Sequence, residues 1–273
     1  MLLQVEPDNK PIFHAINKRK MYQESEIPNF DHLFQRYKNL YDNIDDTIIN
    51  QDNFDNLSTL GNIGSQFNFL DIKLRLAFAI SRIDLRQEYM DQKFGDLGLC
   101  HLMLYKFNDL WFAYEAFVQL YNNLNNPSIQ NKVRWLTQGT NASYLNLIEI
   151  QDAIARANRE LNDKFNSASH RQSLNNYVQY CISKARGGQI ELLNSIIGKI
   201  DIKNSVRNLN ITDWLSLSYA IRNNFVHNGE TTVTTPELNY SKKKDLIVVL
   251  YELLVITSLR VTQKMIEDKI NEY

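Results

Sequence analysis

The side chains best suited to take part in a reaction lie between Ala220 and Glu230, where Arg222, Asn223 and His227 follow one another at short spacing. A guanidinium stabilises charge on phosphoryl oxygens, and an imidazole moves a proton near neutral pH. The amide of Asn223, four residues before His227, shares its helical face and is expected to hold the ring in position. The three groups together suit the handling of a phosphate. An equally simple interpretation is structural, with Arg222 in an ion pair and His227 capping a helix end.

A helix must position these side chains. Thr212 or Asp213 is a suitable N-cap, and Asn228-Gly229 is a typical helix stop, because glycine tolerates the left-handed conformation. This places His227 in or just past the last turn, where the partial negative charge of the helix end favours the imidazolium. Arg222 lies five residues earlier, so a regular helix would not align the two side chains. Unwinding at the helix end would bring His227 toward Arg222.

This stretch resembles a known family. Arg222 and His227 are separated by four residues, the first of which is Asn223, and His227 is followed by Asn-Gly; this pattern is similar to the R-x4–6-H signature of HEPN domains. The resemblance implies a small α-helical bundle and a metal-independent RNA endonuclease of toxin–antitoxin, phage-defence or CRISPR-linked systems. It also implies a homodimer in which two copies of the motif meet. Carried over by position, Arg222 and His227 are catalytic and Asn223 is a supporting polar residue. The resemblance spans about residues 97–273.

A second candidate is Glu115, within the mostly apolar stretch Leu97 to Tyr121, which we predict to be a central helix. Asn108, Glu115 and Asn122 recur every seven residues and form one narrow polar seam. A buried carboxylate needs a partner, and Arg222 is the attractive one. A solvent-exposed Glu115 is the alternative. The segment Leu110 to Phe117 also resembles, more weakly, an early HEPN helix that carries an acidic residue.

The activity that the resemblance implies is RNA cleavage without a metal or a cofactor. A histidine would deprotonate the ribose 2′-hydroxyl, which DNA lacks, and the arginine would stabilise the phosphoryl charge. The alternative is a non-catalytic HEPN-like module that binds RNA, a nucleotide or a protein partner, with Arg222 as an anion anchor. A purely structural helical interaction protein is the third hypothesis. For a nuclease, the expected partners are an RNA substrate, a second copy of the chain, and an antitoxin or defence-system protein.

Composition limits the class of protein. The chain has 273 residues, 44% of them hydrophobic, with 9 Gly and 5 Pro, which excludes a largely disordered or fibrous chain. The formal net charge of −1 means that nucleic-acid binding needs a local patch. Two distant cysteines suggest no zinc site or disulfide framework, and the N-terminus has no secretory signal pattern. We therefore expect a cytoplasmic protein without a membrane span.

We predict an all-α, HEPN-like helical bundle with an N-terminal extension. Residues 1–68 form an acidic, Asn-rich arm and linker, with a loop between Asn50 and Asn68, and residues 69–273 form the helical body. The body begins with an apolar stripe, and its last helix is expected from Ser241 to Lys269, with Ser241 as N-cap. The stripe consists of Ile72, Leu76, Ala79, Ile80 and Ile83.

The arm and the body differ in local charge. Five aspartates and no cation lie between Tyr41 and Asn56, whereas Cys181 to Asn210 has an excess of Lys and Arg. A solvated charge pattern is one interpretation. An acidic arm that covers the basic body before a ligand arrives is the other.

Overall fold

In the computed structural model, the described residues are 31–50, 57–81, 83, 97–125, 128–231 and 237–271. These ranges contain no strand, only an isolated bridge between Ile200 and Val206, so the predicted all-α class is confirmed. The elements are α1 (Asp31–Asn50), α2 (Leu57–Ala79), α3 (Leu97–Leu124), η4 (Trp135–Thr137), η5 (Gly139–Asn146), α4 (Ile148–Lys164), α5 (Ala168–Lys184), α6 (Gly188–Ile197), α7 (Ile211–Asn228) and α8 (Tyr240–Asn271).

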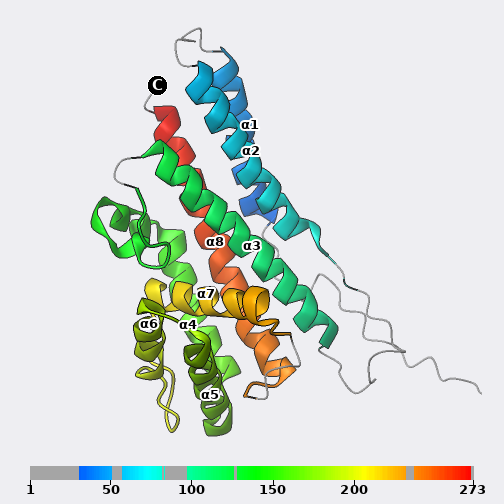
Figure 1. Ribbon diagram of the computed structural model, residues 1–273, viewed down its shortest axis with the longest axis vertical. Helices are drawn as coiled ribbons and strands as arrows, with labels where there is room; N and C mark the ends of the chain where they lie inside the picture. Colours follow the sequence, from blue (N-terminus) through cyan, green and yellow to red (C-terminus); the bar gives the residue numbers. More distant parts are fainter. Residues whose placement is uncertain are drawn as a thin grey trace, which may run out of the picture.

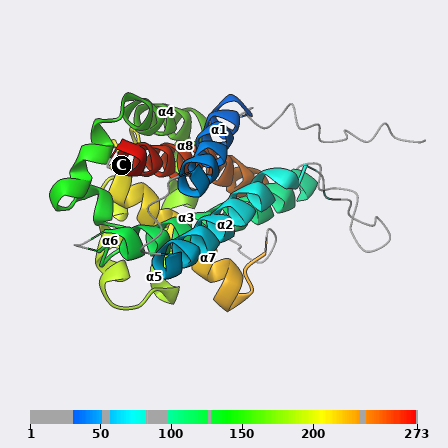
Figure 2. The same cartoon turned by 90° about the horizontal axis from the view of Figure 1, so that it is seen from above.

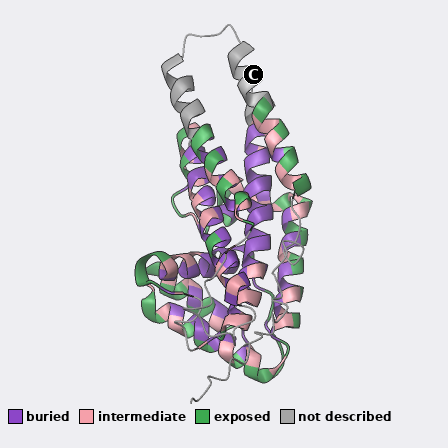
Figure 3. Ribbon diagram, turned by 90° about the vertical axis from the view of Figure 1, so that its right-hand side faces the viewer, coloured by how far each residue is buried: buried purple, intermediate pink, exposed green. Residues whose placement is uncertain are grey.

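The helices are arranged around α8. The long helices α1, α2, α3 and α8 run lengthwise, while α5, α6 and α7 gather at one end, with α7 crossing the long helices (Figure 1). Seen from above, α8 lies among α1, α3 and α4, all of which contact it (Figure 2). The helix that leads to the C-terminus is buried along most of its length (Figure 3). No helix in the described ranges is long and apolar enough to cross a bilayer.

The central helix α3 has the apolar character that its sequence predicts. Trp111, Tyr114 and Phe117 have no solvent exposure, and Tyr121 is also buried. These rings pack against one another and against Trp135 from η4. The aromatic stripe is therefore core, and it fixes the position of the polar seam on the same helix.

The structure corrects the boundary between arm and body. Helix α2 begins at Leu57, so most of the expected loop is helical, and the 68/69 boundary falls inside α2. Helix α1 joins the same core, since the buried Tyr37 hydroxyl donates to Asp71 of α2 at 3.2 Å. The low helix propensity of Asn, Gly and Ser is overridden by tertiary packing of α2 on α3. Of the five arm aspartates, only Asp42 has a described side chain, and it pairs with Lys38 on α1 itself.

The predicted apolar stripe is wrong within α2, where Ile72, Leu76 and Ala79 are exposed, but Ile80 and Ile83 follow the helix and pack against the core. Ile72 and Leu76 are about half exposed, whereas Leu70, Leu74 and Ala77 are buried against α3. Both sets repeat at helical spacing, and the buried set also includes the polar Asp71, which makes its apolar pattern incomplete. Asp71 is tolerated there because Tyr37 and Arg75 satisfy its carboxylate.

Helix α8 is close to its predicted bounds but starts differently. It begins at Tyr240, and the side chain of Asn239, rather than Ser241, accepts the backbone N–H of Lys242 at 2.9 Å. Asn and Ser are both strong N-caps, so spacing alone does not choose between them.

One buried carboxyl on α8 predicts a pH-dependent stability. Burial raises the pKa of Glu252 to about 7 from 4.5; Glu160 adds to the effect, while Arg156 and Lys164 oppose it. The folded state binds this proton more tightly than the unfolded chain, so the stability penalty is absent below about pH 4.5, grows between about pH 4.5 and 7, and is fully present above pH 7. We expect Glu252→Gln to raise the free energy of unfolding by on the order of 1–3 kcal/mol at about pH 8 and to leave it little changed at about pH 4. Thermal melts of both proteins at the two pH values test this, and a pH-independent difference would contradict it.

Candidate active site

Helix α7 carries the motif and is well delimited. Its N-cap is Asn210, two residues before the predicted Thr212. Asn210 and Asp213 form a reciprocal capping box, with the Asp213 N–H donating to Asn210 and the Asn210 N–H donating to Asp213. The helix ends at Asn228 because Gly229 adopts φ 62°, the left-handed conformation expected at this stop. His227 therefore lies in the last helical turn, as predicted.

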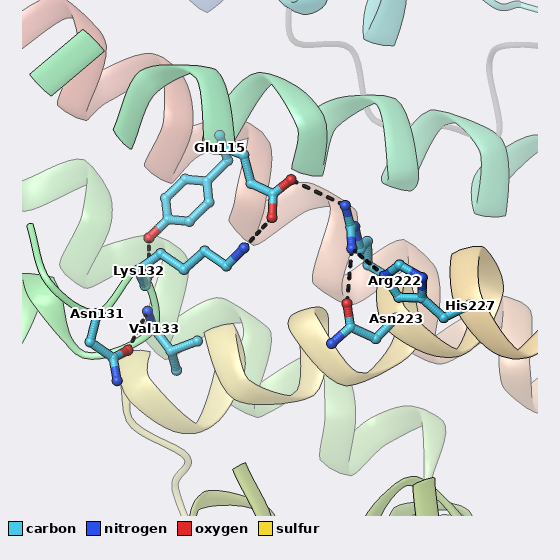
Figure 4. Close-up of polar contacts among 8 residues, drawn as sticks. Glu115, Asn131, Lys132, Val133, Arg222, Asn223 and His227 are labelled. Carbon is cyan, nitrogen blue, oxygen red and sulfur yellow. Dashed lines mark hydrogen bonds and ion pairs between the residues drawn. The ribbon is translucent and has the colours of Figure 1, made fainter. Parts of the chain in front are cut away.

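Arg222 and His227 meet without any unwinding. The helix is continuous to Asn228, and the long Arg222 side chain reaches along it, so that its Nη1 lies 3.3 Å from His227 Nε2 (Figure 4). The expectation that a regular helix would not align the two side chains is therefore wrong, and no unwinding is needed for the contact. The Arg222 side chain is 14% exposed and rests over the Phe112 ring at 5.1 Å, while His227 is exposed. A guanidinium held in place thus adjoins an imidazole that solvent and ligands can reach.

Asn223 contacts the arginine, not the histidine. Its Oδ1 accepts a hydrogen bond from Arg222 Nη1 at 3.0 Å, and no hydrogen bond joins it to His227 within the described part of the chain. The predicted role in holding the ring is therefore not seen in this geometry. Because Nη1 donates to Asn223, the amide helps to direct that nitrogen, which also contacts His227.

Glu115 is the partner of Arg222, as the sequence predicted. Its Oε2 lies 3.3 Å from Arg222 Nη2, and its Oε1 pairs with Lys132. Figure 4 shows the carboxylate between the two cations, one on α7 and the other on the segment that follows α3. One carboxylate that joins two cations is well satisfied, which explains how a half-buried charge is held on this helix.

Lys132 is the site residue that sequence spacing did not reveal. The segment that carries it is fastened to α3, since the Asn122 side chain binds both the N–H and the C=O of Ile129. The Tyr114 hydroxyl donates to the Lys132 carbonyl, and the Lys132 ammonium lies 4.7 Å from the centre of the Tyr219 ring. Two members of the predicted polar seam, Glu115 and Asn122, therefore organise this segment. The third, Asn108, donates to Leu104 of its own helix.

The chain just after the motif is anchored in the core. The Glu230 N–H donates to the Asn224 carbonyl at 3.0 Å, and the Glu230 carboxylate pairs with Lys243 of α8. Burial raises the pKa of the Tyr177 phenol, which stays protonated and donates to Glu230 Oε1 at 3.0 Å. Glu230 and Lys243 are both almost fully buried. Helices α5, α7 and α8 therefore meet at the residue next to the helix stop.

Two residues of the motif, Asn223 and His227, line a cleft of about 920 Å³. Ser216, Tyr219, Asn223 and His227 form its α7 side, at the spacing of one helical face. The 129–134 segment and the turn between α5 and α6 form its other walls. Arg222 does not line this cleft, but its Nη1 contacts two residues that do. Arg222 therefore lies directly behind two residues of the cleft wall, Asn223 and His227.

The described residues contain neither a metal-binding cluster nor a disulfide. Across the described ranges, no group of three or more His, Cys, Asp or Glu side chains is placed to hold a metal ion. Cys100 and Cys181 are both buried, and neither forms a disulfide within the described residues. Comparison of this chain with protein-family models, with curated proteins and with solved structures found no match.

Proposed function

We propose that this chain is a metal-independent endoribonuclease of HEPN type that acts as a toxin or phage-defence effector in the cytoplasm. The observation that carries the proposal is the contact of 3.3 Å between Arg222 Nη1 and the exposed His227 Nε2 at the edge of the cleft. A phosphodiester beside both groups would meet a fixed positive charge and a proton carrier. Glu115 and Asn223 orient the guanidinium.

The proposed reaction needs only these groups and the RNA. An imidazole takes the proton of the ribose 2′-hydroxyl, O2′ attacks the adjacent phosphorus, and the bond to the 5′-oxygen breaks as that oxygen receives a proton from a protonated group. The products carry a 2′,3′-cyclic phosphate and a 5′-hydroxyl. Arg222 stabilises the negative charge that develops on the phosphoryl oxygens.

Incubation with RNA in EDTA tests the proposal. We expect the wild-type chain to cleave RNA and to leave a DNA strand of the same sequence intact, because DNA lacks the attacking hydroxyl. The new ends should be a cyclic phosphate and a 5′-hydroxyl. Cleavage of both strands, or a 5′-phosphate product, would contradict this mechanism.

We also propose that the active form is a homodimer with the two motifs facing each other. The surface beside His227 is apolar enough for such a contact, since Val226 and Tyr105 are 41% and 46% exposed and Phe225 packs edge-on against Tyr105. The His227 imidazole of one protomer would then act as general base and that of its partner as general acid. We expect a dimeric mass at micromolar concentration, and a monomer with full activity would contradict the arrangement.

The second candidate function is binding without cleavage. It is favoured by the cationic side chains of the cleft, which attract an anion whether or not a reaction follows. RNA binding by wild-type protein, with no cleavage by either wild type or His227→Ala, would support this function over the nuclease.

A further inference from the structure

The cleft beside the motif is also lined by cations that take no part in the proposed reaction. One wall is the turn between α5 and α6, where Lys184 and Arg186 line the cleft with Gly188 and Gln189. Lys132 and Arg134, on the 129–134 segment, also line the cleft. The one carboxylate in the lining is that of Glu191. The charge of the cleft is therefore strongly positive, although the whole chain has a net charge of −1.

The cations of this cleft are largely unneutralised. Lys132 is paired with Glu115, but in the described part of the chain Arg134, Lys184 and Arg186 have no carboxylate partner. All three side chains belong to exposed residues. Elsewhere in this end of the molecule a lysine is paired, as Lys199 is with Asp213. Like charges that share one cleft repel each other, and an anion in the cleft removes that repulsion.

The helix that starts at this turn adds to the same potential. Gly187, with φ 55°, is the N-cap of α6, and no side chain caps the helix. The N–H groups of Gln189 and Ile190 donate to the carbonyls of Arg186 and Gly187, but the positive end of the helix dipole still lies beside Arg186, where it favours phosphate. Space is open around both Gly187 and Gly188, so a ligand can approach the backbone closely.

We propose that this cleft binds the backbone of single-stranded RNA, with the α5–α6 turn holding other phosphates of the strand whose reacting phosphate lies beside His227. The inference rests on the proposed function only for the place of the reacting phosphate. Both Asn223 and His227 of the motif and the cations of the turn line this cleft, so one strand bound in it would contact both. A cleft of about 920 Å³ has room for a few nucleotides of one strand.

The test compares two variants with the same loss of charge. Lys184→Gln/Arg186→Gln removes two cations from the cleft, and Arg159→Gln/Lys203→Gln removes two exposed cations that do not line it. Binding of a fluorescent single-stranded RNA of about 12 nucleotides is measured against salt, in the His227→Ala background so that the RNA stays intact. We expect the cleft variant to bind roughly 10-fold more weakly and to lower the slope of log K against log salt by about 1.4, which corresponds to two lost phosphate contacts. The control variant should match the parent.

Each remaining outcome decides the proposal. Equal weakening by both variants would show a bulk charge effect and overturn it, as would wild-type protein that does not bind RNA. Competition by AMP as strong as competition by the unlabelled strand would identify a mononucleotide site instead. Duplex RNA that binds as tightly as the single strand would also overturn it. If the cleft variant loses binding while wild-type protein cleaves no RNA, the cleft proposal stands and the nuclease proposal fails.

Discussion

His227→Ala is expected to reduce the rate of RNA cleavage by about 10²- to 10⁴-fold, the usual contribution of a positioned general acid or base. The ring is exposed at the end of α7 and contacts the guanidinium of Arg222. Its removal takes away the proton carrier without opening a cavity in the core. Single-turnover cleavage of a labelled RNA in EDTA measures the effect.

The matched control is His32→Ala, which removes an exposed histidine from α1, far along the chain from the motif. This variant should cleave RNA at the wild-type rate, and both variants should keep the wild-type melting temperature. If His227→Ala cleaves as fast as His32→Ala, the imidazole has no part in the reaction and the proposed mechanism is wrong.

Arg222→Lys is expected to lower the cleavage rate by about 10²- to 10³-fold, although it keeps the positive charge. In the wild type, two guanidinium nitrogens make separate contacts: Nη2 pairs with Glu115, while Nη1 contacts Asn223 and His227. A lysine has one nitrogen on a flexible stem and cannot keep both sets of contacts. The lysine ammonium would pair either with the Glu115 carboxylate or with the phosphate, so one of these two interactions would be lost.

Arg159→Lys on α4 makes the same chemical change on an exposed residue outside the cleft and should be silent. RNA binding by Arg222→Lys should fall much less than its cleavage rate, because the charge remains. Full activity of Arg222→Lys would mean that any cation suffices at this position, and the fork geometry would have no role.

The sequence predicted the parts of the site that depend on one helix. The Asn-Gly stop after His227 and the apolar stripe of α3 are local patterns, and both appear in the structure where they were expected. The ion pair between Glu115 and Arg222 was also predictable, because a carboxylate on an apolar helix requires a partner.

The remaining parts depend on how segments meet in space. Lys132 lies on a non-helical connection, and nothing in its neighbours' spacing shows that Asn122 and Tyr114 hold that connection beside α7. Lys184 and Arg186 belong to a stretch with a basic excess, but only the placement of α5 and α6 turns this excess into a cleft wall. The reach of Arg222 along a straight helix was missed because spacing describes Cα positions, whereas a long side chain covers more than one turn.

If the chain is the proposed nuclease, the anchor made by Glu230, Lys243 and Tyr177 affects how much order the motif must gain when RNA binds. It immobilises the backbone at the motif's end during folding, so the entropy of ordering it, about 1–2 kcal/mol per residue, is already lost before RNA arrives. A preorganised end of this kind lets more of the interaction with RNA appear as affinity or rate, because less is consumed in arranging the enzyme.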